Sequence, residues 1–118
     1  MKGDPKTLKA LERLARIKAD RELKKFAAFS LHVSAARARV EGFQTALLQA
    51  HQAASPLSLP EARAANAQAG RTARQLIQAD AELARMLPRF EVARQQASRD
   101  FGRAEVLYAL ARRATKPG

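Results

Sequence analysis

The chain has 118 residues, a formal net charge of +11 and no cysteine. This length allows one domain and is too short for a protein kinase catalytic domain, while the lack of cysteine excludes disulfides and thiolate metal sites and fits a reducing cytoplasm. No apolar run reaches the ~18 residues of a membrane span, and the N-terminus is charged, so the sequence predicts neither a transmembrane segment nor a signal peptide.

A first helix is expected over about residues 5–54. Asp4 is a good N-cap, and Pro5 fits the first helical position because its missing N–H has no partner there. Apolar residues with a 3-4 spacing then predict a coiled-coil seam: Phe26, Phe29, Val33, Ala36, Val40, Phe43, Leu47, Ala50 and Ala54. Upstream, the pattern is less regular through Leu8, Leu11, Ala15, Ala19 and Leu23, which predicts a phase shift near residue 22.

A turn is expected at residues 55–58, because Pro56 ends the first helix and Ser58 with Glu61 forms a capping box for the next. The second helix is expected over about 59–114. Its seam consists of Ala62, Ala65, Ala69, Thr72, Leu76, Ala79, Leu83, Met86, Phe90, Ala93, Ala97, Ala104, Leu107 and Ala111, and is broken only at Asp100. The fold class is therefore predicted to be all-α, a single antiparallel coiled-coil hairpin of two long helices over residues 1–118.

Counting outward from the turn predicts that residues whose numbers sum to about 113 lie opposite each other. Phe43 would then face Gly70, Leu11 would face Gly102, and Leu23 would face Phe90. A large residue opposite a glycine would let the two backbones approach closely, which would offset the ~1 kcal/mol that glycine costs in a helix.

The triplet Asp100-Phe101-Gly102 matches the magnesium-binding letters of protein kinases. It is expected within a helix, with Phe101 packed toward the seam, and the chain has no glycine-rich loop, strand lysine or catalytic loop. The carboxylates are scattered singly among basic residues at ion-pair spacing. We therefore expect no enzymatic activity, no cofactor, no metal site and no small-molecule substrate.

The charge is concentrated at the open end of the predicted hairpin. Residues 1–25 and 89–118 carry net charges of +5 and +4, whereas residues 26–88 carry only +2. Leu14 and Ile17 on the first helix, and Val106 and Leu110 on the second, lie off the seam at the same end, where a two-helix hairpin has nothing to cover them. This end is therefore expected to bind a partner.

Two stretches, "LKALERLARIKADREL" (residues 8–23) and "RDFGRAEVLYALARR" (residues 99–113), resemble the terminal segments of FliJ, the stalk protein of flagellar export, and of its YscO-type injectisome relatives. The resemblance implies a cytoplasmic stalk at the inner-membrane export apparatus. Its joined termini would enter the hexameric export ATPase, and its hairpin body would contact the export gate protein or escort chaperones.

The residues expected to bind the ATPase are basic or apolar and lie near the two termini: Lys9, Arg13, Arg16, Ile17, Arg103, Val106, Leu110, Arg112 and Arg113. Those expected to bind partners from the hairpin body are Phe43, Leu47 and Leu48.

Two other interpretations use the same charge. A chain with a net charge of +11 would bind phosphates, so it could be a basic helical nucleic-acid-binding protein, although it has one tyrosine and no set of stacking aromatics. A basic amphipathic hairpin could also bind a membrane surface, although there is no tryptophan and the seam is rich in alanine.

Overall fold

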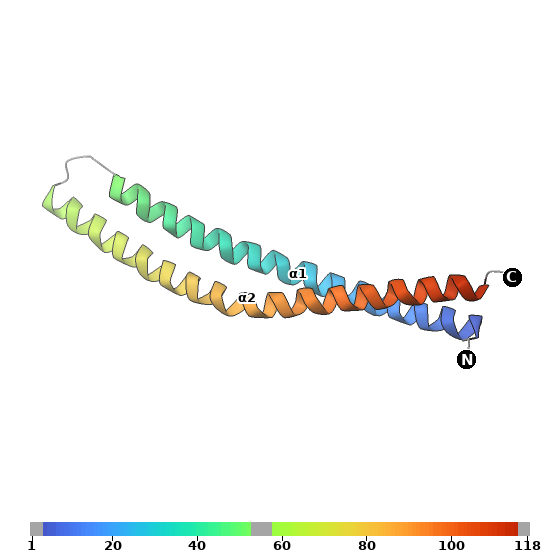
Figure 1. Ribbon diagram of the computed structural model, residues 1–118. Helices are drawn as coiled ribbons and strands as arrows, with labels where there is room; N and C mark the ends of the chain where they lie inside the picture. The colour runs from blue at the N-terminus through green and yellow to red at the C-terminus, as the bar shows by residue number, and fades with distance from the viewer. Residues whose placement is uncertain (1–3, 53–57, 116–118) are drawn as a thin grey trace. The chain divides into compact units, whose positions relative to one another are not determined.

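The computed structural model describes residues 4–52 and 58–115. They form two α-helices, α1 (Pro5–Gln52) and α2 (Leu59–Thr115), and every described residue except Asp4 and Ser58 is helical. The helices pack against each other as an antiparallel coiled-coil hairpin, as predicted (Figure 1). The predicted turn lies outside the described residues except for Ser58.

The hairpin divides into two compact units. Unit 1 combines Met1–Ser30 with Arg89–Gly118, so the first part of α1 packs on the last part of α2. Unit 2 is Leu31–Pro88, in which the last part of α1 packs on the first part of α2.

Both helices begin at the predicted caps. The backbone N–H of Leu8 donates to the Asp4 carbonyl at 2.9 Å, and the Thr7 hydroxyl donates to the Asp4 carboxylate at 3.4 Å. At the start of α2, the backbone N–H of Glu61 donates to Ser58 Oγ at 3.3 Å. Ser58 thus satisfies a backbone donor that the first turn of α2 leaves without an intrahelical partner, whereas Asp4 accepts the first backbone hydrogen bond of α1 through its carbonyl.

Small and aromatic residues form the seam of unit 1. Its buried residues are Ala19, Ala97, Asp100, Ala104 and Ala111. Phe90 of α2 packs against two aromatic rings of α1, with its centroid 5.2 Å from that of Phe26 and 6.3 Å from that of Phe29. Aromatic packing therefore supplies the large apolar contact that the alanines lack.

The predicted phase shift near residue 22 is wrong. The 3-4 spacing continues unbroken through Glu12 and Glu22, which hold seam positions and are partly buried. Leu11 and Leu23 are instead 46% and 40% exposed. The two glutamates keep these positions because their carboxylates reach the edge of the seam and pair with Arg16 and Lys25 of the same helix.

The seam of unit 2 is more apolar. Val33, Ala36, Val40 and Ala79 are buried, and the buried Thr72 donates its hydroxyl to the Gln68 carbonyl at 3.0 Å. Across the seam, the guanidinium of Arg39 donates to the Glu82 carboxylate at 3.0 Å.

The predicted register is wrong by several residues. The contacting pairs Phe26–Phe90 and Arg39–Glu82 sum to 116 and 121 rather than about 113. Phe90 therefore lies against Phe26 and Phe29, not opposite Leu23. The prediction assumed a symmetrical turn, whereas side-chain packing along the seam sets the register.

The predicted role of the glycines is also wrong. A Cβ added at Gly42 or Gly102 would meet no heavy atom within 4 Å, and one at Gly70 would meet only the Arg74 guanidinium of its own helix, at 3.6 Å. No large residue packs closely on these backbones. Phe101, expected to pack toward the seam, is 50% exposed because it lies one residue past the seam position held by Asp100.

Candidate partner-binding site

All nine residues predicted to bind the ATPase lie in unit 1, and all are exposed: Lys9, Arg13, Arg16, Ile17, Arg103, Val106, Leu110, Arg112 and Arg113. They do not form one surface. The buried residues of each helix fix its seam positions, and counting from them places eight of the nine residues on one or the other side of the seam. Only Ile17 lies on the outer side of α1.

We call the side of the seam that carries Lys9, Arg16 and Tyr108 the Tyr108 face. Its shallow hollow is lined by Lys9, Glu12, Tyr108, Ala111, Arg112 and Thr115. The guanidinium carbons of Arg16 and Arg112 each lie 5.7 Å from the centroid of the Tyr108 ring. At these distances a cation and an aromatic face attract each other, so Tyr108 holds two basic residues of the predicted site together across α1 and α2.

Arg16 is also held by its own helix. Its Nε donates to Glu12 at 2.9 Å, and this hydrogen bond, together with the charge of Glu12, raises the pKa of the guanidinium. Asp20 and Glu105 add smaller attractions of the same sign. The Tyr108 face therefore mixes basic and acidic groups.

We call the opposite side the Leu110 face. Its shallow hollow is almost wholly apolar and is lined by Ala15, Gly102, Arg103, Val106 and Leu107. Of the predicted site residues, the heptad phase places Arg103, Val106, Leu110 and Arg113 on this face. Gly102 leaves open space within the hollow because nothing lies where its side chain would be.

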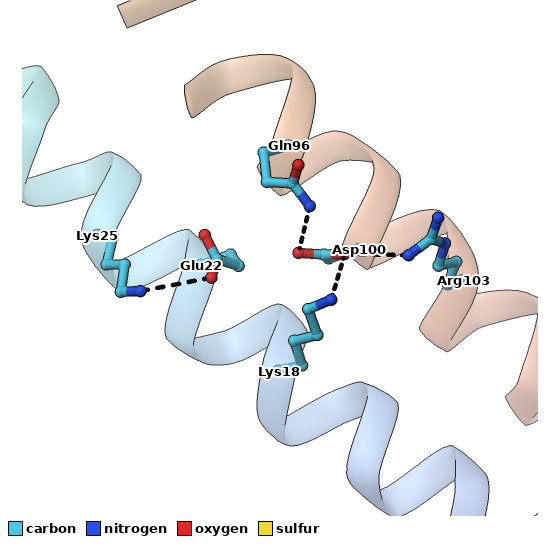
Figure 2. A network of polar contacts seen from close by, with 6 residues as sticks. All are labelled: Lys18, Glu22, Lys25, Gln96, Asp100 and Arg103. Atoms are coloured by element: carbon cyan, nitrogen blue, oxygen red, sulfur yellow. Dashed lines mark hydrogen bonds and ion pairs between the residues drawn. The ribbon is translucent and has the colours of Figure 1, made fainter. Parts of the chain in front are cut away.

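Asp100 points between the helices at the edge of the Leu110 face (Figure 2). Its Oδ1 lies 3.7 Å from Lys18 Nζ of α1 and 3.9 Å from an Arg103 guanidinium nitrogen, and its Oδ2 accepts a hydrogen bond of 3.2 Å from Gln96. Asp100 is only 2% exposed, and Oδ1 has no hydrogen-bond partner. Two exposed cations therefore compensate a buried carboxylate that hydrogen bonds only partly satisfy.

Sequence reasoning found the break in the seam at Asp100 but not its neighbours Lys18 and Arg103, because the cross-helix pairing depends on the register. It also missed Tyr108, whose signal was its position beside the seam, one helical turn before Arg112. Within residues 4–52 and 58–115, no group of three or more His, Cys, Asp or Glu side chains is placed to hold a metal ion.

The residues predicted to bind partners from the hairpin body lie in unit 2. Phe43 and Leu47 hold seam positions and are half-buried, whereas Leu48 is exposed. Phe43 also lines a hollow with Gln75, Gln78 and the ion pair of Arg39 with Glu82.

No protein-family model, curated protein or solved structure matches this chain. Neither of the two described helices is long and apolar enough to cross a membrane.

Proposed function

We propose that this chain is a non-enzymatic coiled-coil stalk of a flagellar or type III protein-export apparatus. Unit 1 would bind the hexameric export ATPase, and unit 2 would bind the export gate protein or escort chaperones. The stalk would then work in the cytoplasm, at the inner-membrane export apparatus. The proposal starts from the resemblance of residues 8–23 and 99–113 to FliJ-like terminal segments.

The observation that carries the proposal is the joint exposure of apolar and basic side chains on unit 1. The chain segments 1–25 and 89–118 carry +9 of the net charge of +11. Among residues 4–52 and 58–115, nine large apolar side chains of unit 1 are exposed, compared with five in unit 2. Single exposed leucines are ordinary in proteins, but a concentration of them at a charged end is typical of a binding surface.

The same surface suggests how binding would proceed. Basic side chains such as Arg112 and Arg113 would attract an acidic ring from a distance, so association should be fast at low salt and slower as salt screens the charges. Apolar residues such as Val106 and Leu110 would then lose contact with water and slow dissociation.

Charge reversal tests the proposal. Arg112→Glu combined with Arg113→Glu should slow association with the purified export ATPase and reduce any stimulation of its ATP hydrolysis. The matched control, Arg63→Glu combined with Arg71→Glu, changes the charge equally in unit 2 and should leave ATPase binding intact.

Nucleic-acid binding is the competing outcome of this experiment. If it is the function, both double variants should weaken binding in proportion to the charge removed, and DNA or RNA should displace the ATPase. Equal effects of the two double variants at about 150 mM salt, where exposed charges more than ~8 Å apart are largely screened, would count against the stalk.

A further inference from the structure

The two faces of unit 1 differ in charge. Acidic residues of its helices either hold seam positions, as Glu12, Glu22 and Asp100 do, or lie on the Tyr108 face. Counted along each helix from the buried seam positions, Asp20 and Glu105 lie on that face. The heptad phase places Glu91 there too, beside its partner Arg94.

The charged residues on the Leu110 face are all basic, and three of them pair with carboxylates of the seam: Lys18 and Arg103 with Asp100, and Lys25 with Glu22. By the same heptad phase, four cations directly flank the seam on this side: Lys18, Lys25, Arg89 and Arg103. Three more form the next row outward: Arg21, Arg99 and Arg113. All seven are exposed, and no acidic residue within the described helices of unit 1 shares these positions.

The same face exposes apolar side chains along both helices. Leu11 and Leu14 of α1, and Val92, Val106 and Leu110 of α2, are exposed there. Between the two helices lies the hollow floored by Ala15 and Leu107, with its open space at Gly102. An apolar hollow between two helices, with exposed apolar and basic residues on the same face, has the pattern of a surface that binds an amphipathic helix.

We propose that the Leu110 face binds an acidic amphipathic helix of the partner, which lies along the groove as a third helix of unit 1. This inference names the partner segment at the end already assigned to ATPase binding, and so rests on the proposed function. Apolar side chains of the incoming helix would pack on Ala15, Val106 and Leu107, with one of them entering the space at Gly102. Its flanking carboxylates would meet Lys18 and Arg103 at the borders.

The composition of the Leu110 face favours an acidic amphipathic helix over other binding partners. A second copy of the chain would place one basic face against another, and the like charges would repel. Nucleic acid would pair with the cations but would leave the apolar hollow without a complementary surface.

The test uses the full chain and a synthetic peptide of about four heptads, with leucine and alanine at the seam positions and glutamate at the flanking positions. The acidic peptide should bind at about 150 mM salt in fluorescence anisotropy, and the same peptide with lysine in place of glutamate should not. Absence of binding by the acidic peptide overturns the proposal.

Gly102→Leu adds an apolar side chain to the lining of the hollow, at a position where a Cβ would meet nothing within 4 Å, and should weaken peptide binding about tenfold, which corresponds to ~1.4 kcal/mol. The matched control is Gly42→Leu, which adds the same side chain into equally open space in unit 2 and should not change binding. Equal affinity of the chain with Gly102→Leu and the unchanged chain overturns the proposal.

A second pair of variants separates the faces. Val106→Glu should repel the acidic peptide, whereas Ala10→Glu places the same charge at an exposed position on the outer side of α1 and should have little effect. An equal loss of peptide affinity with both variants overturns the proposal in favour of a delocalised electrostatic surface. Tighter binding of a DNA duplex or of phosphatidylserine vesicles than of the peptide overturns it in the same way.

The two proposals fail separately. If the purified ATPase binds but is insensitive to Gly102→Leu and Val106→Glu, the partner helix on the Leu110 face is excluded while the stalk function stands. If the acidic peptide binds with the expected dependence on Gly102 but the ATPase does not bind, the export-ATPase assignment fails while the Leu110 face is retained as the binding surface.

Discussion

Unit 2 and unit 1 are built on the same two helices but fill their seams differently. Unit 2 buries Val33, Val40 and small residues, and its cross-helix ion pair, Arg39 with Glu82, lies at the surface. Unit 1 buries four alanines and the carboxylate of Asp100. Because alanine buries little apolar area, unit 1 depends more on its single aromatic cluster.

The difference implies that unit 2 contributes more to stability, whereas unit 1 exposes the surface expected to bind a partner. Outside its aromatic cluster, the seam of unit 1 consists mainly of alanine, glutamate and aspartate and provides little free energy of folding. Unit 1 nevertheless exposes most of the large apolar residues of the described helices and carries most of the net charge. A surface that keeps apolar groups in water is stabilised when a partner covers them, because a partner that binds only the folded state shifts the folding equilibrium. Unit 2 needs no such partner to cover its valines.

The largest expected effect tests the dependence of unit 1 on its aromatic cluster. Phe90→Ala removes the ring that packs on Phe26 and Phe29, and we expect it to lower the free energy of unfolding by about 2–4 kcal/mol in urea denaturation followed by circular dichroism. Hydrogen exchange should show unit 1 losing protection before unit 2.

The control for this prediction is Phe101→Ala. Because Phe101 is half exposed, its loss should cost less than about 1 kcal/mol. If the two variants were equally destabilising, the assignment of Phe90 to the seam and of Phe101 to the surface would be wrong.

The next effect concerns the charged position in the seam of unit 1. Asp100→Leu should raise the free energy of unfolding by about 1–2 kcal/mol, because a buried and incompletely hydrogen-bonded carboxylate gives way to an apolar side chain. Its partners Lys18 and Arg103 are largely exposed and would return to water at little cost. Equilibrium denaturation measures the change.

The matched control is Asp80→Leu, at an exposed position of α2 in unit 2, which should change stability by less than about 0.5 kcal/mol. Sedimentation should be measured for both variants. If Asp100→Leu lowered stability while the chain stayed monomeric, the cations would outweigh the desolvation of the carboxylate, and the seam of unit 1 would be better matched than we conclude.

Much of this comparison could be predicted from the sequence, because apolar spacing reports which face of a helix is buried. This rule placed the seam correctly over residues 26–47 and 69–97. The positions of Glu12 and Glu22 could not be found in the same way, since a search for apolar residues passes over a glutamate that pairs at the edge of a seam.

The candidate site was predicted only in part. Composition and spacing located the basic and apolar residues that the hairpin leaves uncovered, including Val106 and Leu110. The division between the Tyr108 and Leu110 faces also requires the register between helices. That register depends on how Phe90 packs against Phe26 and Phe29, which counting from the turn cannot supply.

A smaller effect is expected when a glycine of each unit is replaced by alanine. Gly42→Ala in unit 2 and Gly102→Ala in unit 1 should each stabilise the chain by about 0.5–1 kcal/mol, because alanine loses less backbone entropy in a helix and a Cβ at either position meets nothing within 4 Å. Thermal denaturation would show the gain. Destabilisation by Gly102→Ala alone would mean that another backbone approaches unit 1 at this point.

The smallest effect is the dependence of stability on pH that the ion pair of Glu91 with Arg94 gives to unit 1. Hydrogen bonding from Arg94 lowers the pKa of Glu91 in the folded chain, so the carboxylate stabilises the fold above the unfolded-state pKa of about 4.3 and loses that contribution as the pH falls through the lower folded-state value. Both side chains are exposed, so the effect should be small and should shrink with added salt. The test measures the thermal midpoint as the pH is lowered, for the unchanged chain and for the control Glu91→Gln. At low salt, the midpoint of the variant should fall less than that of the unchanged chain. If the variant retained the whole decrease, the ion pair would contribute nothing to the acid sensitivity of unit 1.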